Sequence, residues 1–286
     1  MFKINFHSFL LCILACCVLS LTASSAQGAV FTVSNTSDAG AGSLRQAILD
    51  AEASAGADTI NVAVTGTVLL NSSLPNITQS LTINGSSQTG FIVSGQGITG
   101  LRPFTVKGGV TVAEINNLTV TGGNTNSGGG GIQLEAATLN LINVTVDRNF
   151  ASASSGDVLP GGGGIGALGG TLNVVNSRIT VNNAPGIFGG GILIDSGALT
   201  MTGSSVSDSS SSGGGIAIIN NGTARIENST ISHNRVNEEG GGLLLEGGTL
   251  RMSNVTLSRN VGDIAGGGLR LDSGNVALRN VTIGGG

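Results

Sequence analysis

Residues 240–260 read GGGLLLEGGTLRMSNVTLSRN, and this order of a glycine triplet, aliphatic residues and two asparagines recurs along the chain. The six triplet segments are GGGI at 129–132, 162–165, 189–192 and 213–216, and GGGL at 240–243 and 266–269. Successive triplets begin 33, 27, 24, 27 and 26 residues apart. A period in this range is typical of repeat architectures. It is too short for a strand–helix–strand unit, so we interpret each repeat as one turn of a β-solenoid.

Aligning the repeats on the triplets places aliphatic residues in common columns. Residues two apart on a strand face the same side, so the columns predict three inward-facing strands per turn. The first strand carries Ile132, Ile165, Ile192, Ile216, Leu243 and Leu269, then Leu134, Ala167, Ile194, Ile218, Leu245 and Leu271. The second carries Leu139, Leu172, Leu199, Ala224, Leu250 and Val276, then Leu141, Val174, Met201, Ile226, Met252 and Leu278. The third carries Val146, Ile179, Val206, Ile231, Leu257 and Ile283. We therefore predict an all-β fold, a parallel β-helix with a continuous aliphatic core.

Two asparagine columns follow the same period. The first is Asn143, Asn176, Asn228, Asn254 and Asn280; the second, six residues later, is Asn149, Asn182, Asn234 and Asn260. Asparagine amides can hydrogen-bond from coil to coil, and asparagine tolerates the left-handed conformation of sharp corners. We interpret both columns as structural ladders and expect Asn228 and Asn254 to stack inside the solenoid. The triplets are expected to supply positive φ at a third corner.

The chain begins with a segment typical of export signals. Residues 1–28 combine Lys3, an apolar stretch and a small-residue region, with cleavage expected after Ala26 or Gly28. Lipoprotein processing at Cys16 and a retained N-terminal anchor are the alternatives. All three cysteines lie in this segment, so the mature chain would contain no thiol.

Residues 29–60 predict an N-terminal cap made of a strand and a helix. Ser43 and Gln46 are spaced as a capping box, apolar residues follow at helical spacing, and Gly56 is expected to end the helix. An amphipathic helix at this point would cover the open end of the first coil. Residues 61–286 are predicted to form the β-helix, with irregular coils first and regular repeats from about Asn117.

The repeats NVTVDRN, NSRITVN, NSTISHN and NVTLSRN, each combined with a GGG triplet, resemble the polymorphic outer membrane protein repeat of chlamydial surface proteins. They also resemble exported bacterial right-handed β-helix proteins of the pectate-lyase-like superfamily. The stretch NTSDAGAGSLRQAILDAEASAGADTI resembles the N-terminal cap of such proteins. The resemblance implies a right-handed β-helix that is secreted or held at the bacterial outer membrane. This fold hosts lyases, hydrolases, adhesins and passenger domains, so it leaves the function open.

One pair of acids is a candidate catalytic site. Glu246 and Asp272 are expected on adjacent coils, with Arg270 beside them. Paired carboxylates can hydrolyse glycosides or bind calcium. We favour a structural interpretation, in which these residues belong to an exposed row of charged side chains on a solenoid. We also interpret His233 as an exposed corner residue without a catalytic role. It lies in a surface column with Arg148, Val181, Asp208 and Arg259.

The amino-acid composition limits the classes of molecule that the protein is expected to bind. The net charge is −4 and Lys107 is the only lysine after the leader, so we expect no basic patch and no nucleic-acid partner. The chain has no Trp and no Tyr, so the aromatic platforms of polysaccharide-degrading enzymes are missing. We therefore expect an exported, non-catalytic adhesin, passenger or structural protein without a cofactor. Its ligand would be a carbohydrate or a cell-surface protein. The alternative is a polysaccharide lyase or glycoside hydrolase.

The last repeat leads us to expect self-association at the C-terminal end of the solenoid. The chain ends at a glycine triplet where another coil could begin, so it is either a fragment or a solenoid whose last coil is open. An open coil presents unpaired strand edges and aliphatic residues, and we expect it to self-associate.

Overall fold

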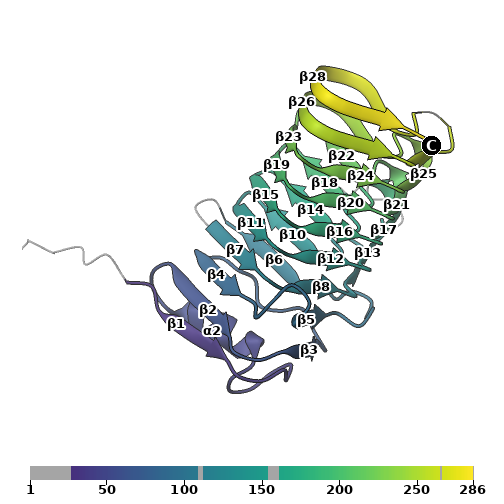
Figure 1. The fold of residues 1–286 in the computed structure, drawn as a ribbon. Helices are drawn as coiled ribbons and strands as arrows, with labels where there is room; N and C mark the ends of the chain where they lie inside the picture. Colours follow the sequence, from purple (N-terminus) through teal and green to yellow (C-terminus); the bar gives the residue numbers. More distant parts are fainter. Residues whose placement is uncertain (1–26, 109–111, 154–160, 265, 286) are drawn as a thin grey trace, which may run out of the picture.

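Parallel strands wind around one axis and stack coil upon coil from the N-terminal to the C-terminal end (Figure 1). The computed structural model describes residues 27–108, 112–153, 161–264 and 266–285. Nearly all of the predicted leader therefore lies outside the described residues. The coils form a right-handed parallel β-solenoid, which confirms the predicted fold class.

Three columns of strands build the solenoid. The first column is β6 (Phe104–Lys107), β10 (Ile132–Glu135), β14 (Ile165–Leu168), β18 (Ile192–Asp195) and β22 (Ile216–Ile219). The second is β1 (Val30–Val33), β2 (Asp58–Val62), β4 (Leu81–Asn84), β7 (Val112–Asn116), β11 (Thr138–Ile142), β15 (Thr171–Val175), β19 (Ala198–Thr202) and β23 (Thr223–Glu227). The third is β3 (Gly66–Leu69), β5 (Phe91–Ser94), β8 (Thr119–Thr121), β12 (Thr145–Asp147), β16 (Arg178–Thr180), β20 (Ser205–Ser207) and β24 (Thr230–Ser232). The long strands β26 (Leu243–Ser258) and β28 (Leu269–Gly284) each pass through all three columns.

A fourth, shorter ladder runs beside these columns and was not predicted. Its strands are β9 (Asn124–Thr125), β13 (Phe150–Ala151), β17 (Asn183–Phe188), β21 (Ser210–Gly213), β25 (Arg235–Glu239) and β27 (Val261–Gly262). These segments show no regular alternation of apolar residues, as the sequence SSSG of β21 illustrates. Their pairing follows from the register of the coils on either side, so a hydrophobic pattern could not indicate it.

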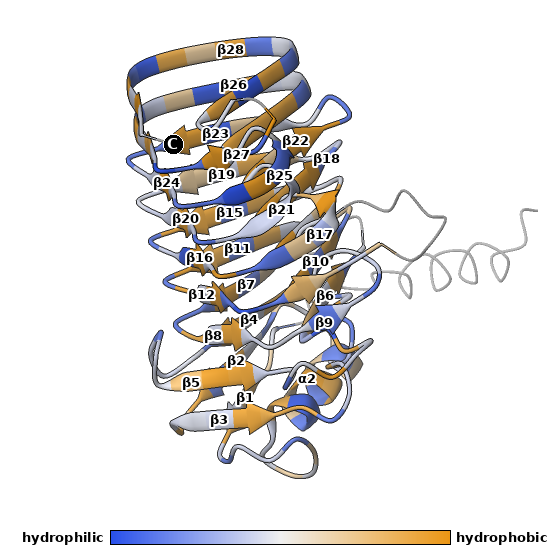
Figure 2. Cartoon of the chain, turned by 90° about the vertical axis from the view of Figure 1, so that its right-hand side faces the viewer, coloured by the Kyte–Doolittle hydropathy of each residue, from blue (hydrophilic) through white to orange (hydrophobic). Residues whose placement is uncertain are grey.

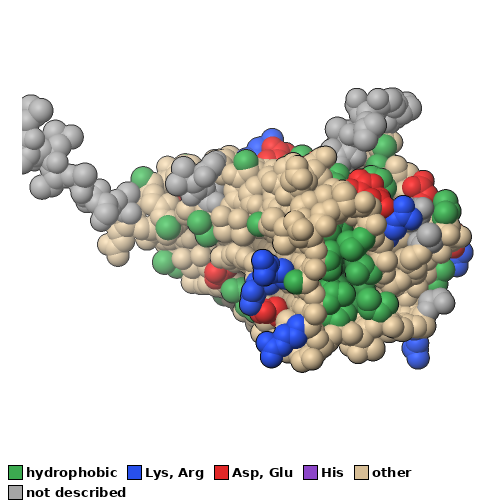
Figure 3. Space-filling view, turned by 90° about the horizontal axis from the view of Figure 1, so that it is seen from above, with side chains coloured by type: hydrophobic (Ala, Val, Ile, Leu, Met, Phe, Trp, Pro, Cys, Tyr) green, Lys and Arg blue, Asp and Glu red, His purple; other side chains and the backbone are tan. Residues whose placement is uncertain are grey.

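The predicted inward columns form the core. Hydrophobic residues recur at the same place in successive coils (Figure 2), and the aligned positions from Ile132 to Leu257 are at most 4% exposed. The last coil departs from this pattern because it has a neighbouring coil on one side only. There Leu271, Leu278 and Ile283 are 43%, 46% and 49% exposed, and apolar side chains gather at this end of the molecule (Figure 3).

The predicted helix is present as α2 (Leu44–Ala53), and it lies at the N-terminal end of the solenoid (Figure 1). Four of its residues, Leu44, Ala47, Ile48 and Ala51, are buried in the main core. Whether this helix prevents association of the first coil stays a prediction.

Two details of the predicted helix ends are wrong. Ser43 Oγ accepts the Gln46 amide at 3.2 Å as expected, but the Gln46 side chain donates to Asp50 instead of reaching back. The reason is that the Ser43 amide already donates to the Gly40 carbonyl. The C-cap is Ser54 rather than Gly56.

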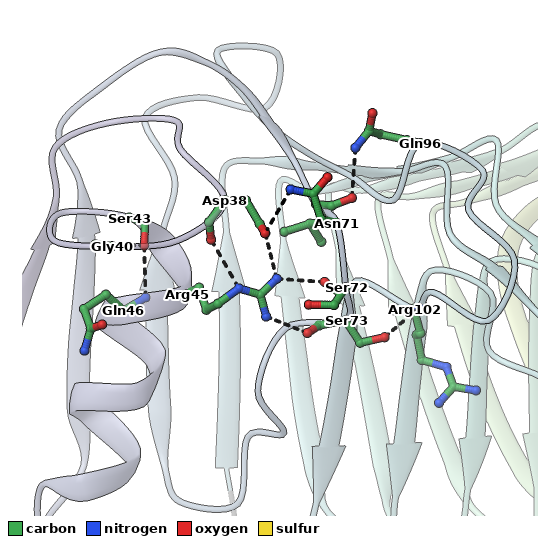
Figure 4. Close-up of polar contacts among 11 residues, drawn as sticks. Asp38, Gly40, Ser43, Arg45, Gln46, Asn71, Ser72, Ser73, Gln96 and Arg102 are labelled. Atoms are coloured by element: carbon green, nitrogen blue, oxygen red, sulfur yellow. Dashed lines mark hydrogen bonds and ion pairs between the residues drawn. The ribbon is translucent and has the colours of Figure 1, made fainter.

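Arg45 ties α2 to the neighbouring coils, a role that the sequence did not indicate (Figure 4). Its guanidinium donates to the carbonyl oxygens of Ser72 and Ser73 at 2.8 and 2.7 Å and to Asp38 Oδ1 at 2.7 Å. Charge-assisted bonds of this kind are stronger than neutral ones, so Arg45 fixes the helix against the solenoid.

The first asparagine column stacks as predicted, but it lies outside the core. The Asn254 amide donates to Asn228 Oδ1 at 3.0 Å, and both residues are exposed. Their φ angles are 55° and 49°, so this column occupies a left-handed corner between the second and third strands. The expectation that Asn228 and Asn254 stack internally is therefore wrong, since a left-handed corner turns the side chain outward.

The second asparagine column is the buried one. Asn149, Asn182, Asn234 and Asn260 are at most 2% exposed, and Ser209 takes the same place in one coil. Asn234 shows the pattern: its Oδ1 accepts the Ser209 amide at 3.1 Å, and its Nδ2 donates to the Val206 carbonyl at 3.1 Å and to Asn260 Oδ1 at 3.0 Å. Buried polar groups must be paired, and here each amide satisfies backbone groups of the adjoining coils.

The buried asparagine column explains part of the need for glycine in the triplets. One glycine in each triplet segment has positive φ, as at Gly129 (56°) and Gly240 (71°). The last glycine of a triplet is needed for a different reason, which is lack of space. A Cβ on Gly131 would lie 2.9 Å from Asn149 Cγ, and one on Gly242 would lie 2.8 Å from Asn260 Nδ2. The triplet therefore leaves room for the buried amide, in addition to the turn that we predicted.

The structure also contains a buried column of serines that the sequence analysis did not predict. Ser177, Ser204 and Ser229 are at most 5% exposed and follow the exposed asparagine corner. Ser204 Oγ accepts the Ser177 amide at 3.0 Å, and Ser229 Oγ accepts the Ser204 amide at 3.2 Å. Valine occupies the same place in other coils, so no single residue type marks the column.

The buried asparagine column should contribute more stability than the exposed asparagine column. We expect Asn234→Ala to lower the free energy of unfolding by about 3 kcal/mol, because it leaves buried backbone groups unpaired. Asn234→Ser should cost about half as much, since Ser209 shows that a hydroxyl fits this column. Asn254→Gly, which keeps the left-handed corner, should cost at most about 1 kcal/mol. Urea titration measures all three, and equal losses at Asn234 and Asn254 would contradict the distinction.

Candidate functional site

The predicted acidic pair lies on the outer face of the first column, next to the fourth ladder. Glu246 ends the first part of β26, and its register partner in β28 is Ser273 rather than Asp272. Asp272 is an extra residue in an irregular step of the strand. It is ion-paired with the Arg270 guanidinium, whose Nε donates to Asp272 Oδ1. The predicted alignment of the two acids is therefore one residue out of register, although the three residues remain neighbours.

Glu246 and Asp272 line the same small hollow. Its other lining residues are Phe188, Ser212, Gly213, Glu238 and Leu244, and its volume is about 60 Å³. Beneath it, Leu193, Ala217 and Leu244 form an apolar cluster on the outside of the first column, with Phe188 packed against it. Sequence alignment of the triplets could not place Phe188 and Glu238 here, because they come from the unpredicted fourth ladder.

The carboxyl group of Glu246 is electrostatically perturbed. Partial burial raises the pKa of Glu246, and the nearby carboxylate of Asp272 raises it further. A carboxyl group with a raised pKa beside a second carboxylate is what general acid catalysis by a glycosidase requires. Against this use, Asp272 is already paired with Arg270, and the hollow is much smaller than the pockets of roughly 300 Å³ or more that hold small ligands.

His233 lies at the exposed corner that precedes the buried asparagine column. Arg148, Val181, Asp208, His233 and Arg259 all have φ between 51° and 56° there. Arg259 Nη1 lies 3.4 Å from His233 Nε2, and both side chains are exposed. The structure brings no carboxylate to His233 among its described hydrogen bonds. The column is thus a backbone corner whose side chains differ in charge from coil to coil.

Arg102 is a further arginine that the sequence did not single out. It donates to the carbonyl oxygens of Gly128 and Gly129, each at 2.7 Å, and to Ser127 Oγ at 2.9 Å. Burial lowers the pKa of Arg102, while Glu135 opposes this effect. Because its hydrogen bonds go to Ser127, Gly128 and Gly129, Arg102 holds the turn that leads into the first triplet in place.

The outward face of the second column carries a larger hollow. It has a volume of about 320 Å³ and is lined by Arg225, Glu227, Arg251, Met252, Ser253, Ala277, Leu278 and Arg279. The expectation of no basic patch is wrong for this face. Net charge could not indicate it, because the three arginines are 26 and 28 residues apart in the sequence and meet only when the coils stack.

The described residues were compared with two further kinds of feature, membrane-spanning helices and clusters of metal-ligating side chains. None of their helices is long and apolar enough to cross a membrane. No group of three or more His, Cys, Asp or Glu side chains in the described part of the chain is arranged to hold a metal ion. The calcium site considered for Glu246 and Asp272 therefore gains no support from the geometry.

Comparison with known families agrees with the fold. Residues 163–286 match the family model described as right handed beta helix region. The match and the stacked coils together show a parallel β-helix protein. A search of curated proteins found no match.

Glu246 should make stability depend on pH. A carboxyl group with a raised pKa in the folded state stabilises the fold below its ordinary pKa, and this contribution is lost as pH rises through the folded value. Glu246→Gln should therefore be more stable than wild type at neutral pH, with the difference shrinking to zero below about pH 4.

Glu135→Gln is the matched control for this experiment. Glu135 lies in the same outward row but is paired with Lys107 at 3.3 Å, so its substitution should bring no gain. Thermal unfolding over a pH series measures both variants. A constant difference between Glu246→Gln and wild type at every pH would show that Glu246 is not the titrating group.

Proposed function

We propose that this protein is an exported, non-catalytic β-helix that acts at the bacterial cell surface or outside the cell. An adhesin, a passenger domain and an extracellular structural protein are the roles that fit this proposal. The observation that carries it is the contrast between the interior and the surface of the coils. The aliphatic core columns keep their chemistry from coil to coil, whereas the outward rows, apart from the asparagine corner, change in charge and size.

The left-handed corner column illustrates the contrast. All five residues from Arg148 to Arg259 have the same backbone conformation, yet their side chains are basic, aliphatic, acidic, imidazole and basic. The repeat therefore maintains a scaffold and leaves the surface free to vary. A scaffold with an extended, variable surface suits binding along its length better than chemistry at one point.

Export is inferred from the leader. Residues 1–28 combine the apolar stretch and the small-residue region of a signal peptide, and the resemblance to exported bacterial β-helix proteins supports the same location. Surface or outer-membrane attachment belongs to this proposal as well.

A second candidate function is polysaccharide cleavage by a lyase or glycoside hydrolase. The observation that favours it is the raised pKa of Glu246 beside Asp272. The ion pair between Asp272 and Arg270 and the small volume of the hollow count against it.

Export is tested by expressing the full chain in a bacterium with an outer membrane and fractionating the cells. We expect the chain outside the cytoplasm, with a new N-terminus at Gln27 or Ala29 by mass spectrometry. A Cys16→Ser variant distinguishes lipoprotein processing, because only that route requires the cysteine. An uncleaved chain confined to the cytoplasm would refute the proposal.

Turnover is tested with the purified chain on polygalacturonate and alginate. We expect no release of reducing or unsaturated ends, from wild type or from the Glu246→Gln/Asp272→Asn double variant. If wild type releases products and the double variant does not, the acidic pair is catalytic and the second candidate replaces the first.

A further inference from the structure

Three arginines gather on the outward face of the second column. Arg225 of β23 and Arg251 of β26 are direct register partners, and Arg279 of β28 is the register partner of Ser253. They surround the hollow of about 320 Å³ on this face, in which the small side chain of Ala277 leaves the space open. Figure 3 shows Lys and Arg side chains together on the flank beside the apolar end of the last coil. We call this surface the arginine hollow, defined by Arg225, Arg251 and Arg279.

The charge of the arginine hollow is only partly compensated. Glu227 is its single acidic lining residue, and Arg225 Nη2 donates to Glu227 Oε1 at 2.6 Å. Arg251 and Arg279 are exposed, and the described residues offer neither of them an ion pair. Like charges placed directly opposite one another destabilise a sheet, so the pairing of Arg225 with Arg251 costs stability. Stacking of the coils therefore does not account for the cluster.

Guanidinium groups match carboxylates and sulfates, because their donors form a planar fork that binds two oxygens at once. Adjacent coils lie about 4.8 Å apart, so the three arginines can contact successive anionic groups of an extended chain. A further coil stacked on β28 would leave the three arginines exposed, because they point outward from the sheet rather than along the axis.

The outward row that contains Arg225 and Arg251 continues toward the N-terminal end with three uncharged polar side chains, followed by Glu114 in β7. In β11, β15 and β19 it carries Asn140, Asn173 and Thr200, and Asn173 Nδ2 donates to Asn140 Oδ1 at 2.8 Å. Amide and hydroxyl groups are suited to sugar hydroxyls. This stretch of the row, from β11 to β26, contains no aromatic residue, whereas single-stranded nucleic acids are usually held by stacking on aromatic rings.

We propose that the arginine hollow binds an anionic polysaccharide, with the carboxylate or sulfate groups on Arg225, Arg251 and Arg279. The neutral row from Thr200 to Asn140 contacts the sugar hydroxyls. This inference rests on the proposed function, since it names the ligand class of the extracellular scaffold. It places the ligand on the second column, away from Glu246 and Asp272.

Binding is measured by calorimetry with polygalacturonate and heparin as anionic probes, neutral dextran as the uncharged probe, and a single-stranded DNA as the competing polyanion. The test variant is Arg251→Gln/Arg279→Gln. The control is Arg148→Gln/Arg259→Gln, which changes the net charge equally at the exposed left-handed corner. Arg251→Lys/Arg279→Lys keeps the charge without the planar fork. Far-UV circular dichroism and thermal midpoints confirm that each variant is folded.

We expect wild type to bind at least one anionic polysaccharide and not dextran, with affinity falling as salt rises. The Arg251→Gln/Arg279→Gln variant should bind at least about tenfold more weakly, the lysine variant should lie between it and wild type, and the control should change less than about twofold. Equal losses in the test and control variants, tighter binding of DNA than of either polysaccharide, or no polysaccharide binding would each overturn the inference. Any of these outcomes leaves the proposed function standing if the chain is exported and inactive, because export and turnover are measured separately.

Discussion

The buried asparagine amides and the glycines that make room for them join most of the regular coils at one corner, with Ser209 in the place of asparagine in one coil. Aliphatic contact alone does not fix the register of the coils, because hydrophobic contact has no direction, so register depends on the backbone hydrogen bonds of the parallel ladders and on the buried amides. The amide of Asn234, in contrast, bonds to groups of both adjoining coils, which fixes their spacing and register. A buried amide needs space as well as partners, and the last glycine provides that space in the four triplets that end at Gly131, Gly164, Gly215 and Gly242.

Because interior residues hold the coils together, many outward-facing side chains can vary without disturbing the core. A binding surface can therefore form on the outside of the solenoid. Each outward row can change its chemistry at every coil without disturbing the core. On the first column the result is a small acidic hollow around Glu246, and on the second it is the arginine hollow. The two surfaces lie on different columns, so a binding surface and an acidic cluster can coexist on one scaffold.

Much of the fold could be predicted from the sequence, because a period near 26 residues aligns both apolar and polar columns. Alignment predicts that amides of both asparagine columns hydrogen-bond from coil to coil, as they do, but it wrongly predicts that Asn228 and Asn254 lie inside, since they occupy an exposed corner. Alignment shows that residues share a column, and it does not show which way a left-handed corner turns them. The fourth ladder and the serine column carry no common residue pattern that alignment could show. Alignment does place Arg225 and Arg251 in one column, but Arg279 lies two residues further along its strand, so the hollow between them depends on the stacked coils. Alignment places Glu246 and Asp272 on adjacent coils, but it does not show the irregular step of the strand at Asp272. Their neighbours Phe188 and Glu238 belong to the fourth ladder, which the alignment does not predict.

The most direct test is a double-mutant cycle between Gly131 and Asn149, measured as free energies of unfolding. A Cβ on Gly131 would meet the Cγ, Nδ2 and Oδ1 atoms of Asn149 at 2.9, 2.9 and 3.1 Å. If the amide and the glycine are fitted to each other, Gly131→Ala should cost about 2 kcal/mol or more in wild type and at least about 1 kcal/mol less in the Asn149→Ser background. Equal costs in both backgrounds would contradict this, and would mean that the triplet is needed only for its backbone conformation.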